Sequence, residues 1–284
     1  MPGSLLPALG GRQEVLARLR ASIRTMERGA PELQAVDDPQ TRGGWTLGVR
    51  EFDRRLGGGL DPASLHEVKT VPRGAGATAG DWAAALGFAL RLTARRLECL
   101  TGAQSAPAPV LWCWSSQFAR EFGAPYGGGL AALGFAPSDW LFVETARASE
   151  ALWAMEEGLR SQSLALVIGV ISEVELTPAR RLSLAAAEHA TPCLLVTDPR
   201  LSPAGSTATR WRIEACSSGR HPFNASAPGA QRYGVVLERC RHRPMTHEHH
   251  PLWLEWSDET HRFHMAAALA DRASEARAAG ARSR

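Results

Sequence analysis

The sequence contains no apolar run that approaches the roughly 20 residues needed to cross a membrane as a helix. Cysteine is also scarce: the chain has 5, they form no C-x-x-C pair, and their number is odd. This pattern argues against a disulfide framework and is typical of free thiols in a reducing compartment. The first residues lack the charged and apolar regions of a signal peptide. We therefore expect a cytoplasmic protein with no membrane contact.

Lysine is almost absent, because Lys69 is the only lysine among 32 basic Lys and Arg residues. The formal net charge of +3 favours an acidic partner such as DNA only weakly. The 284 residues are 44% hydrophobic, which is enough for a packed core and argues against wholesale disorder. A chain of this length forms one large domain or two small ones.

Residues 65–97 read as a strand, a glycine-rich loop and a helix. We expect the strand over residues 65–68, the loop over 69–80, and a helix that begins near Asp81 with this residue as its N-cap. This is the layout of a phosphate-binding loop in a nucleotide-binding α/β domain.

The loop departs from the working pattern G-x-x-x-x-G-K-[ST]. In the best register the second glycine is Gly76 and the hydroxyl is Thr78, but Val71 replaces the first glycine and Ala77 replaces the lysine. Alanine cannot place a positive charge on the β- and γ-phosphates. We interpret the segment as a degenerate nucleotide loop, with Arg73 as a partial substitute for the lysine, formed by Val71, Arg73, Gly74, Gly76, Ala77 and Thr78.

Short apolar runs alternate with helical patterns along the rest of the chain. We expect buried strands over residues 110–114, 140–143, 164–171 and 193–197, with helices between them. This order predicts an α/β fold with a mainly parallel, doubly wound sheet. Residues 210–215, 233–239 and 252–256 read as strands that extend the sheet as antiparallel edge strands.

The two ends of the chain differ from this core. Residues 11–29 predict an amphipathic helix, which either packs on its own domain or docks a neighbouring chain, and its apolar side carries Val15, Leu16, Leu19, Ile23 and Met26. We expect three parts: an N-terminal helix and linker over 1–44, an α/β domain over 45–265, and a flexible Ala/Arg-rich tail over 266–284.

The order of these landmarks over residues 45–256 resembles the ATP-binding core of the RecA family. The segment TLGVREFDRRLGGGLDPASLHEV resembles the helix, turn and strand that precede the phosphate loop, and LALVIGVI resembles the Walker B strand. By length, layout and Arg- and Trp-rich texture the chain is more similar to the ImuA family, RecA-like proteins of a bacterial SOS mutagenesis cassette. The resemblance implies a RecA-like core preceded by an N-terminal helix.

The positions that the RecA family uses for catalysis are substituted. The Walker B aspartate, which supports Mg²⁺, falls on Gly169 or Val170, and the glutamate that activates water falls on Ser115 or Ser116. Since three independent parts are missing, we expect no hydrolysis, no catalytic residues and no cofactor. Residual nucleotide binding stays open.

Other sites are weaker in the sequence. Residues 242–250 contain four histidines, but the prolines beside them favour a solvated loop, and we expect no metal site. The loops that contact DNA in the RecA family are short here. Arg200, Arg210 and Arg212 flank the second loop, and we expect any non-specific contacts with DNA phosphates to come from them.

The ImuA resemblance implies a non-catalytic accessory role in DNA-damage-induced translesion synthesis. The implied partners are ImuB, a protein of the Y-family polymerase type, and an error-prone C-family DNA polymerase. The partner surface is either the N-terminal helix or the C-terminal edge and tail. Two alternatives stay open: a divergent ATP-binding recombination mediator, and a cell-division inhibitor like SulA.

Overall fold

The computed structural model describes residues 45–71, 78–102, 108–198, 203–221, 223–224, 226–241 and 251–266. The helix expected over residues 11–29 lies outside these residues, and so does the tail expected over 266–284 apart from Ala266. No helix of the described part is long and apolar enough to cross a membrane.

A nine-stranded sheet forms the centre of the fold, in the order β3-β2-β4-β5-β1-β6-β7-β8-β9. The strands are β1 (Leu65–Thr70), β2 (Val110–Ser115), β3 (Trp140–Thr145), β4 (Leu166–Val170), β5 (Cys193–Thr197), β6 (Thr209–Ala215), β7 (Arg232–Cys240), β8 (Leu252–Ser257) and β9 (Arg262–Met265). Strands β1 to β6 pair in parallel, and β7, β8 and β9 are added antiparallel. The expected α/β class with a RecA-like, mainly parallel sheet is therefore confirmed.

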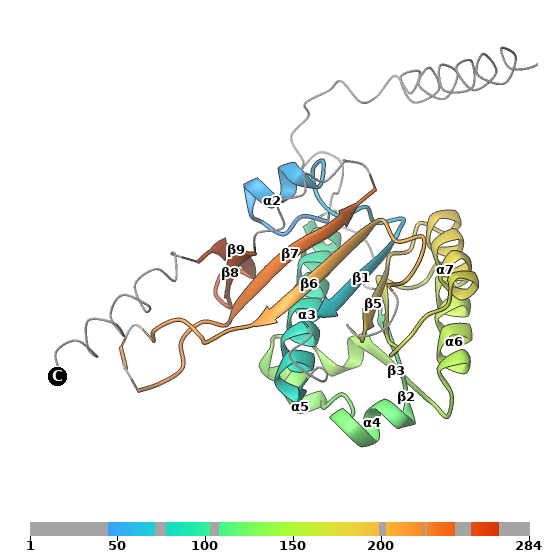
Figure 1. The fold of residues 1–284 in the computed structure, drawn as a ribbon, viewed down its shortest axis with the longest axis horizontal. Coiled ribbons are helices and arrows are strands. Elements are labelled where there is room, and N and C mark those ends of the chain that lie inside the picture. The colour runs from blue at the N-terminus through green and yellow to red at the C-terminus, as the bar shows by residue number, and fades with distance from the viewer. Residues whose placement is uncertain are drawn as a thin grey trace, which may run out of the picture. The chain divides into compact units, whose positions relative to one another are not determined.

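Helices cover both faces of the parallel strands (Figure 1). They are α2 (Arg50–Arg55), α3 (Ala79–Gly102), α4 (Ser116–Phe122), α5 (Gly127–Ala132), α6 (Ala148–Arg160) and α7 (Leu176–Glu188), with a 3₁₀ turn η2 at Pro137–Asp139. One core cluster lies between the sheet and α3, and the other lies between the sheet and the pair α6 and α7. Strands β2, β4 and β5 are buried on both faces, which explains why they read as continuous apolar runs.

Two sequence expectations about the strands are wrong. Residues 210–215 were expected in an antiparallel edge strand, but β6 pairs in parallel with β1, with Val68 opposite Trp211. Alternation of polar and apolar residues reports one covered face, not the strand direction, and here Trp211 and Ile213 face the α3 cluster. The run 140–143 was expected to be a buried strand, but β3 is the outermost strand and exposes Leu141 and Phe142.

Buried arginines fasten α3 to segments far away in the sequence. Arg95 donates from Nε to the Thr46 carbonyl at 2.9 Å and from a terminal nitrogen to the His261 carbonyl at 3.3 Å. Arg91 is 4.9 Å from the centre of the Trp256 ring and 3.3 Å from a carboxylate oxygen of Asp258. These contacts hold the β8–β9 hairpin and the start of the domain against the same helix.

Candidate functional site

A RecA-like fold would bind a nucleotide at the carboxyl ends of β1, β4 and β5, a region that we call the nucleotide edge. The expected order of strand, loop and helix is present, since β1 ends at Thr70 and α3 begins at Ala79. Val71 is half-buried, and its N–H donates to the Ile213 carbonyl at 3.0 Å. The remaining loop residues predicted to be degenerate, Arg73, Gly74, Gly76 and Ala77, lie outside the described residues.

The first turn of α3 is closed by a capping box between Thr78 and Asp81. The Asp81 carboxylate accepts from the Thr78 backbone N–H at 2.9 Å and from the Thr78 hydroxyl at 2.7 Å. The same hydroxyl oxygen accepts from the Asp81 N–H at 3.3 Å. Thr78 is therefore the N-cap, and the expectation that Asp81 is the N-cap is wrong, because the helix begins two residues earlier at Ala79.

This arrangement changes the electrostatics of the helix N-terminus. Asp81 is only 2% exposed, so a carboxylate is held at the positive end of α3. In a phosphate loop that end of the helix binds the phosphate of the nucleotide. Here a side chain of the protein supplies the negative charge, and it would repel a phosphate.

A second buried carboxylate, Glu67, organises the centre of the same edge. Glu67 lies in the middle of β1 with no exposed surface. It accepts hydrogen bonds from the Thr197 hydroxyl at 2.8 Å, the Ala204 N–H at 2.9 Å and Arg210 Nε at 2.6 Å. Arg210 also donates to the Ala204 carbonyl at 2.9 Å, so the chain after β5 is fastened to β1.

The single lysine of the chain belongs to the same network. Lys69 Nζ lies 4.0 Å from a carboxylate oxygen of Glu67, and its side chain is 7% exposed. Burial lowers the pKa of Lys69, and the nearby carboxylates of Glu67, Glu238 and Asp198 oppose this shift. The lysine therefore helps to balance charges inside the protein.

The three arginines predicted to contact DNA phosphates have different surroundings. Arg210 is 15% exposed and forms the ion pair with Glu67. Arg212 pairs with Glu238 on the neighbouring strand, and Arg200 lies outside the described residues. A phosphate contact by Arg210 or Arg212 would compete with a carboxylate that is already in place.

The positions of the Walker B aspartate are apolar and tightly packed. Gly169 lies in β4 against α6, and a Cβ atom added there would lie 2.3 Å from the Met155 sulfur. Val170 is the last residue of β4 and is 1% exposed. A metal-binding carboxylate at either position would need the surrounding core to move.

The two serines at the position of the catalytic glutamate have local structural partners. Ser115 is the N-cap of α4, and its hydroxyl oxygen accepts from the Phe118 N–H at 3.3 Å. The Ser116 hydroxyl donates to the Thr145 carbonyl at 3.2 Å. Both hydroxyls thus fix the turn between β2 and α4.

Within the described residues, no group of three or more His, Cys, Asp or Glu side chains is arranged to hold a metal ion. The histidine-rich segment 242–250 lies outside those residues. The sequence identified Asp81 at the start of the helix after the loop, but it did not identify Glu67 as central to this edge. The available signal was the charged pair in the segment LHEVKT, because a central strand rarely buries Glu and Lys unless they are paired.

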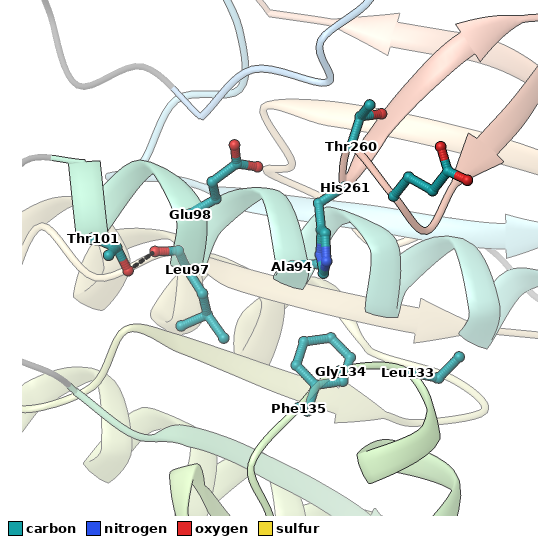
Figure 2. Close-up of a pocket in the computed structure, with 10 residues that line it drawn as sticks. Ala94, Leu97, Glu98, Thr101, Leu133, Gly134, Phe135, Thr260 and His261 are labelled. Atoms are coloured by element: carbon teal, nitrogen blue, oxygen red, sulfur yellow. Dashed lines mark hydrogen bonds between the residues drawn. The ribbon is translucent and has the colours of Figure 1, made fainter.

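A separate pocket of about 440 Å³ lies at the C-terminal half of α3, away from the nucleotide edge (Figure 2). Side chains of α3, of the connection before β3 and of the β8–β9 turn line it, among them Leu97, Glu98, Phe135 and His261. Two of its polar groups have local partners: the Thr101 hydroxyl donates to the Leu97 carbonyl at 3.0 Å, and Glu98 pairs with Arg95.

The chain matches no family model. It is 30% identical over 195 residues to two curated proteins called Protein ImuA, from Caulobacter vibrioides strain NA1000 / CB15N and from strain ATCC 19089 / CIP 103742 / CB 15. Each alignment covers 65% of this chain and 73% of the relative.

Proposed function

The chain belongs to the ImuA family, and from this membership we propose that it is a non-catalytic accessory protein of DNA-damage-induced translesion synthesis. It acts by binding a polymerase-like partner, and it does not turn over ATP. The partners that the family resemblance implies are a Y-family-type protein, ImuB, and an error-prone C-family DNA polymerase.

One observation carries the non-catalytic part of this proposal: the Asp81 carboxylate at the N-terminus of α3. A nucleotide phosphate brought to this helix end meets a buried negative charge, and the lysine that would attract it is Ala77. The apolar Val170 at the end of β4 supports the same conclusion, since Mg²⁺ lacks a carboxylate ligand there.

The nucleotide part is tested by thermal unfolding of the full chain with and without Mg-ATP and Mg-ADP. A ligand at about 100 times its Kd stabilises a protein by about 2.7 kcal/mol, which is a shift of several degrees. We expect a shift of less than about 1 °C with millimolar nucleotide, and no phosphate release in the presence of single-stranded DNA. A clear shift that disappears in Arg73→Ala or Thr78→Ala would instead establish a working ATP site.

The partner part is tested by co-purification of the full chain with the ImuB-type protein of the same organism. If the N-terminal helix is the partner surface, Leu19→Ala combined with Ile23→Ala removes the complex, because both residues lie on its apolar side. Arg18→Ala combined with Arg20→Ala is the matched control on the polar side. A complex that survives all four substitutions would assign the partner to another surface, and no complex with the wild-type chain would contradict the proposed role.

A further inference from the structure

The pocket at the C-terminal half of α3 has the size of a small-molecule site. Its volume is about 440 Å³, and such sites usually measure about 300–1,000 Å³. It lies at the opposite end of α3 from the Thr78–Asp81 capping box, so it is separate from the nucleotide edge. Figure 2 shows Leu97 on α3 and the His261 ring pointing toward the connection that carries Phe135. Three segments that are distant in the sequence thus form one pocket.

The walls of this pocket are held in place by contacts with neighbouring residues. Phe135 is 7% exposed and packs edge-on against Trp140, with 5.2 Å between the ring centres. His261 packs edge-on against Trp256 at 6.3 Å, and its carbonyl accepts the hydrogen bond from Arg95. The pocket is therefore formed in the absence of a ligand, which lowers the entropic cost of binding.

The charges that line the pocket are negative. Glu98 and Glu259 both line it, and none of its described lining residues is lysine or arginine. Arg95, which is 5% exposed, pairs with Glu98 and so compensates one carboxylate from inside the protein. Glu259 is exposed and has no ion pair with another described residue. The remaining charge favours a cation in the pocket and opposes an anion.

A metal ion is not the cation that this arrangement suits. Two glutamates and a histidine line the pocket, but no group of three or more His, Cys, Asp or Glu in the described residues is arranged to hold a metal ion. Much of the remaining lining is apolar, since it includes Ala94, Leu97, Leu133 and Phe135. Apolar walls favour a ligand with an apolar body. A carboxylate beside them selects a ligand that also carries a positively charged amino group.

We propose that this pocket binds a small organic amine, composed of an apolar ring or chain and a positively charged amino group. The apolar part contacts Leu97, Leu133 and Phe135, and the ammonium group lies near the carboxylate of Glu259. This site differs from the nucleotide edge both in its place and in the charge of its ligand. It does not depend on the proposed accessory role.

The test titrates the full chain with 2-phenylethylamine and follows binding by calorimetry and by saturation-transfer NMR. We expect saturable binding with a Kd on the order of 1 mM or tighter, as befits a ligand of so few atoms. The matched anion, 3-phenylpropanoate, has the same ring on a similar chain, and it should bind at least about tenfold more weakly. Non-specific attraction would instead favour this anion, because the formal net charge of the chain is +3.

Substitutions then locate the site. Glu259→Lys should weaken binding of 2-phenylethylamine at least about fivefold, because it replaces an attractive charge by a repulsive one. Glu188→Lys is the matched control: it changes the net charge equally at an exposed position on α7, and it should bind as the wild type does. Thr101→Trp places a bulky ring in the lining and should also weaken binding. Thermal unfolding checks that each variant is folded.

Absence of saturable binding would overturn the proposal, and so would equal affinities for the amine and the carboxylate or equal binding by the wild type and Glu259→Lys. A blocked peptide, acetyl-Gly-Phe-Lys-Gly-amide, is titrated in parallel. If it binds more tightly than the free amine, the occupant is a side chain of another protein and the assignment to a free amine is wrong. These probes need neither nucleotide nor a polymerase partner, so failure of this site and failure of the proposed function are distinguishable.

Discussion

The nucleotide edge around β1 and the outer edge at β3 differ in whether their buried polar groups have hydrogen-bond partners. At the nucleotide edge, Glu67 and Asp81 are buried, and groups of the same chain donate to both carboxylates. At the outer edge, the indoles of Trp112, Trp114 and Trp140 have no acceptor in the described residues. The two carboxylates at the first edge have donors within the chain, whereas the three indoles at the second edge have no acceptor within the described residues.

The difference shows that the position where this fold usually binds a ligand is occupied here by the protein's own side chains. The fold places a binding site at the carboxyl ends of its parallel strands, and this chain has filled that place with internal ion pairs and a capping box. The buried indoles without an acceptor in the described residues lie near β3, the outermost strand of the sheet. Substitutions that act on one edge and spare the other test whether the contrast is real.

The largest effect is expected at Glu67. Glu67→Ala leaves Arg210 without its carboxylate in a mostly buried position, and loss of one partner of such a pair costs about 3–5 kcal/mol in the free energy of unfolding. Urea denaturation measures the loss. Glu238→Ala is the control, because its pair with Arg212 is partly solvated and should contribute less than about 1 kcal/mol. Equal losses in the two variants would show that the buried Glu67 network contributes no more to the free energy of unfolding than a partly solvated ion pair.

A pair of tryptophan substitutions compares a satisfied donor with an orphaned one. Trp45→Phe removes an indole that donates to the Leu92 carbonyl at 2.7 Å, whereas Trp140→Phe removes an indole that has no acceptor within the described residues. Both changes remove the same volume from a buried site. We therefore expect Trp45→Phe to lower the free energy of unfolding by about 1–2 kcal/mol more than Trp140→Phe does. The reverse order would mean that the Trp140 donor is satisfied in solution.

The smallest effect concerns the pH dependence of Lys69. Burial lowers its pKa in the folded state below the usual 10.5, so between these two values the unfolded chain binds more protons. The contribution of Lys69 to the free energy of unfolding therefore rises with pH in that window. Lys69→Met lacks this rise, so its stability relative to the wild type should fall from pH 7 to pH 10 in urea denaturation. Lys69→Arg, which does not titrate there, should behave like Lys69→Met, and parallel curves for all three would refute the expected shift.

The sequence predicts the layout of the fold well, because apolar runs and glycine positions report burial and chain reversal directly. The strand before the degenerate loop, the apolar β4 and the order of helices follow from such local signals. Pairing direction and strand order do not, since they depend on long-range packing. The apolar run 140–143 predicted burial, yet Leu141 and Phe142 lie at an edge that only the sheet order reveals.

The nucleotide edge was predictable only as an absence. Ala77 and Val170 indicate in the sequence that a lysine and an aspartate are missing, but not which groups take their place. Asp81 was predicted only as a helix N-cap, and Glu67 looks like an ordinary charge in the sequence, because a carboxylate shows its role only through the donors that surround it. The three orphaned indoles are likewise visible only once their neighbours are placed.

The buried arginines of α3 also set the order in which the protein can be completed during synthesis. Arg95 binds the Thr46 carbonyl, 49 residues before it, and the His261 carbonyl, 166 residues after it. The helix emerges from the ribosome long before the hairpin that satisfies it, and contacts of such sequence separation form slowly. Until β8 and β9 are made, Arg91 lacks Trp256 and Asp258, and Arg95 lacks the His261 carbonyl, so this part of the core is completed only when the last strands have been synthesised.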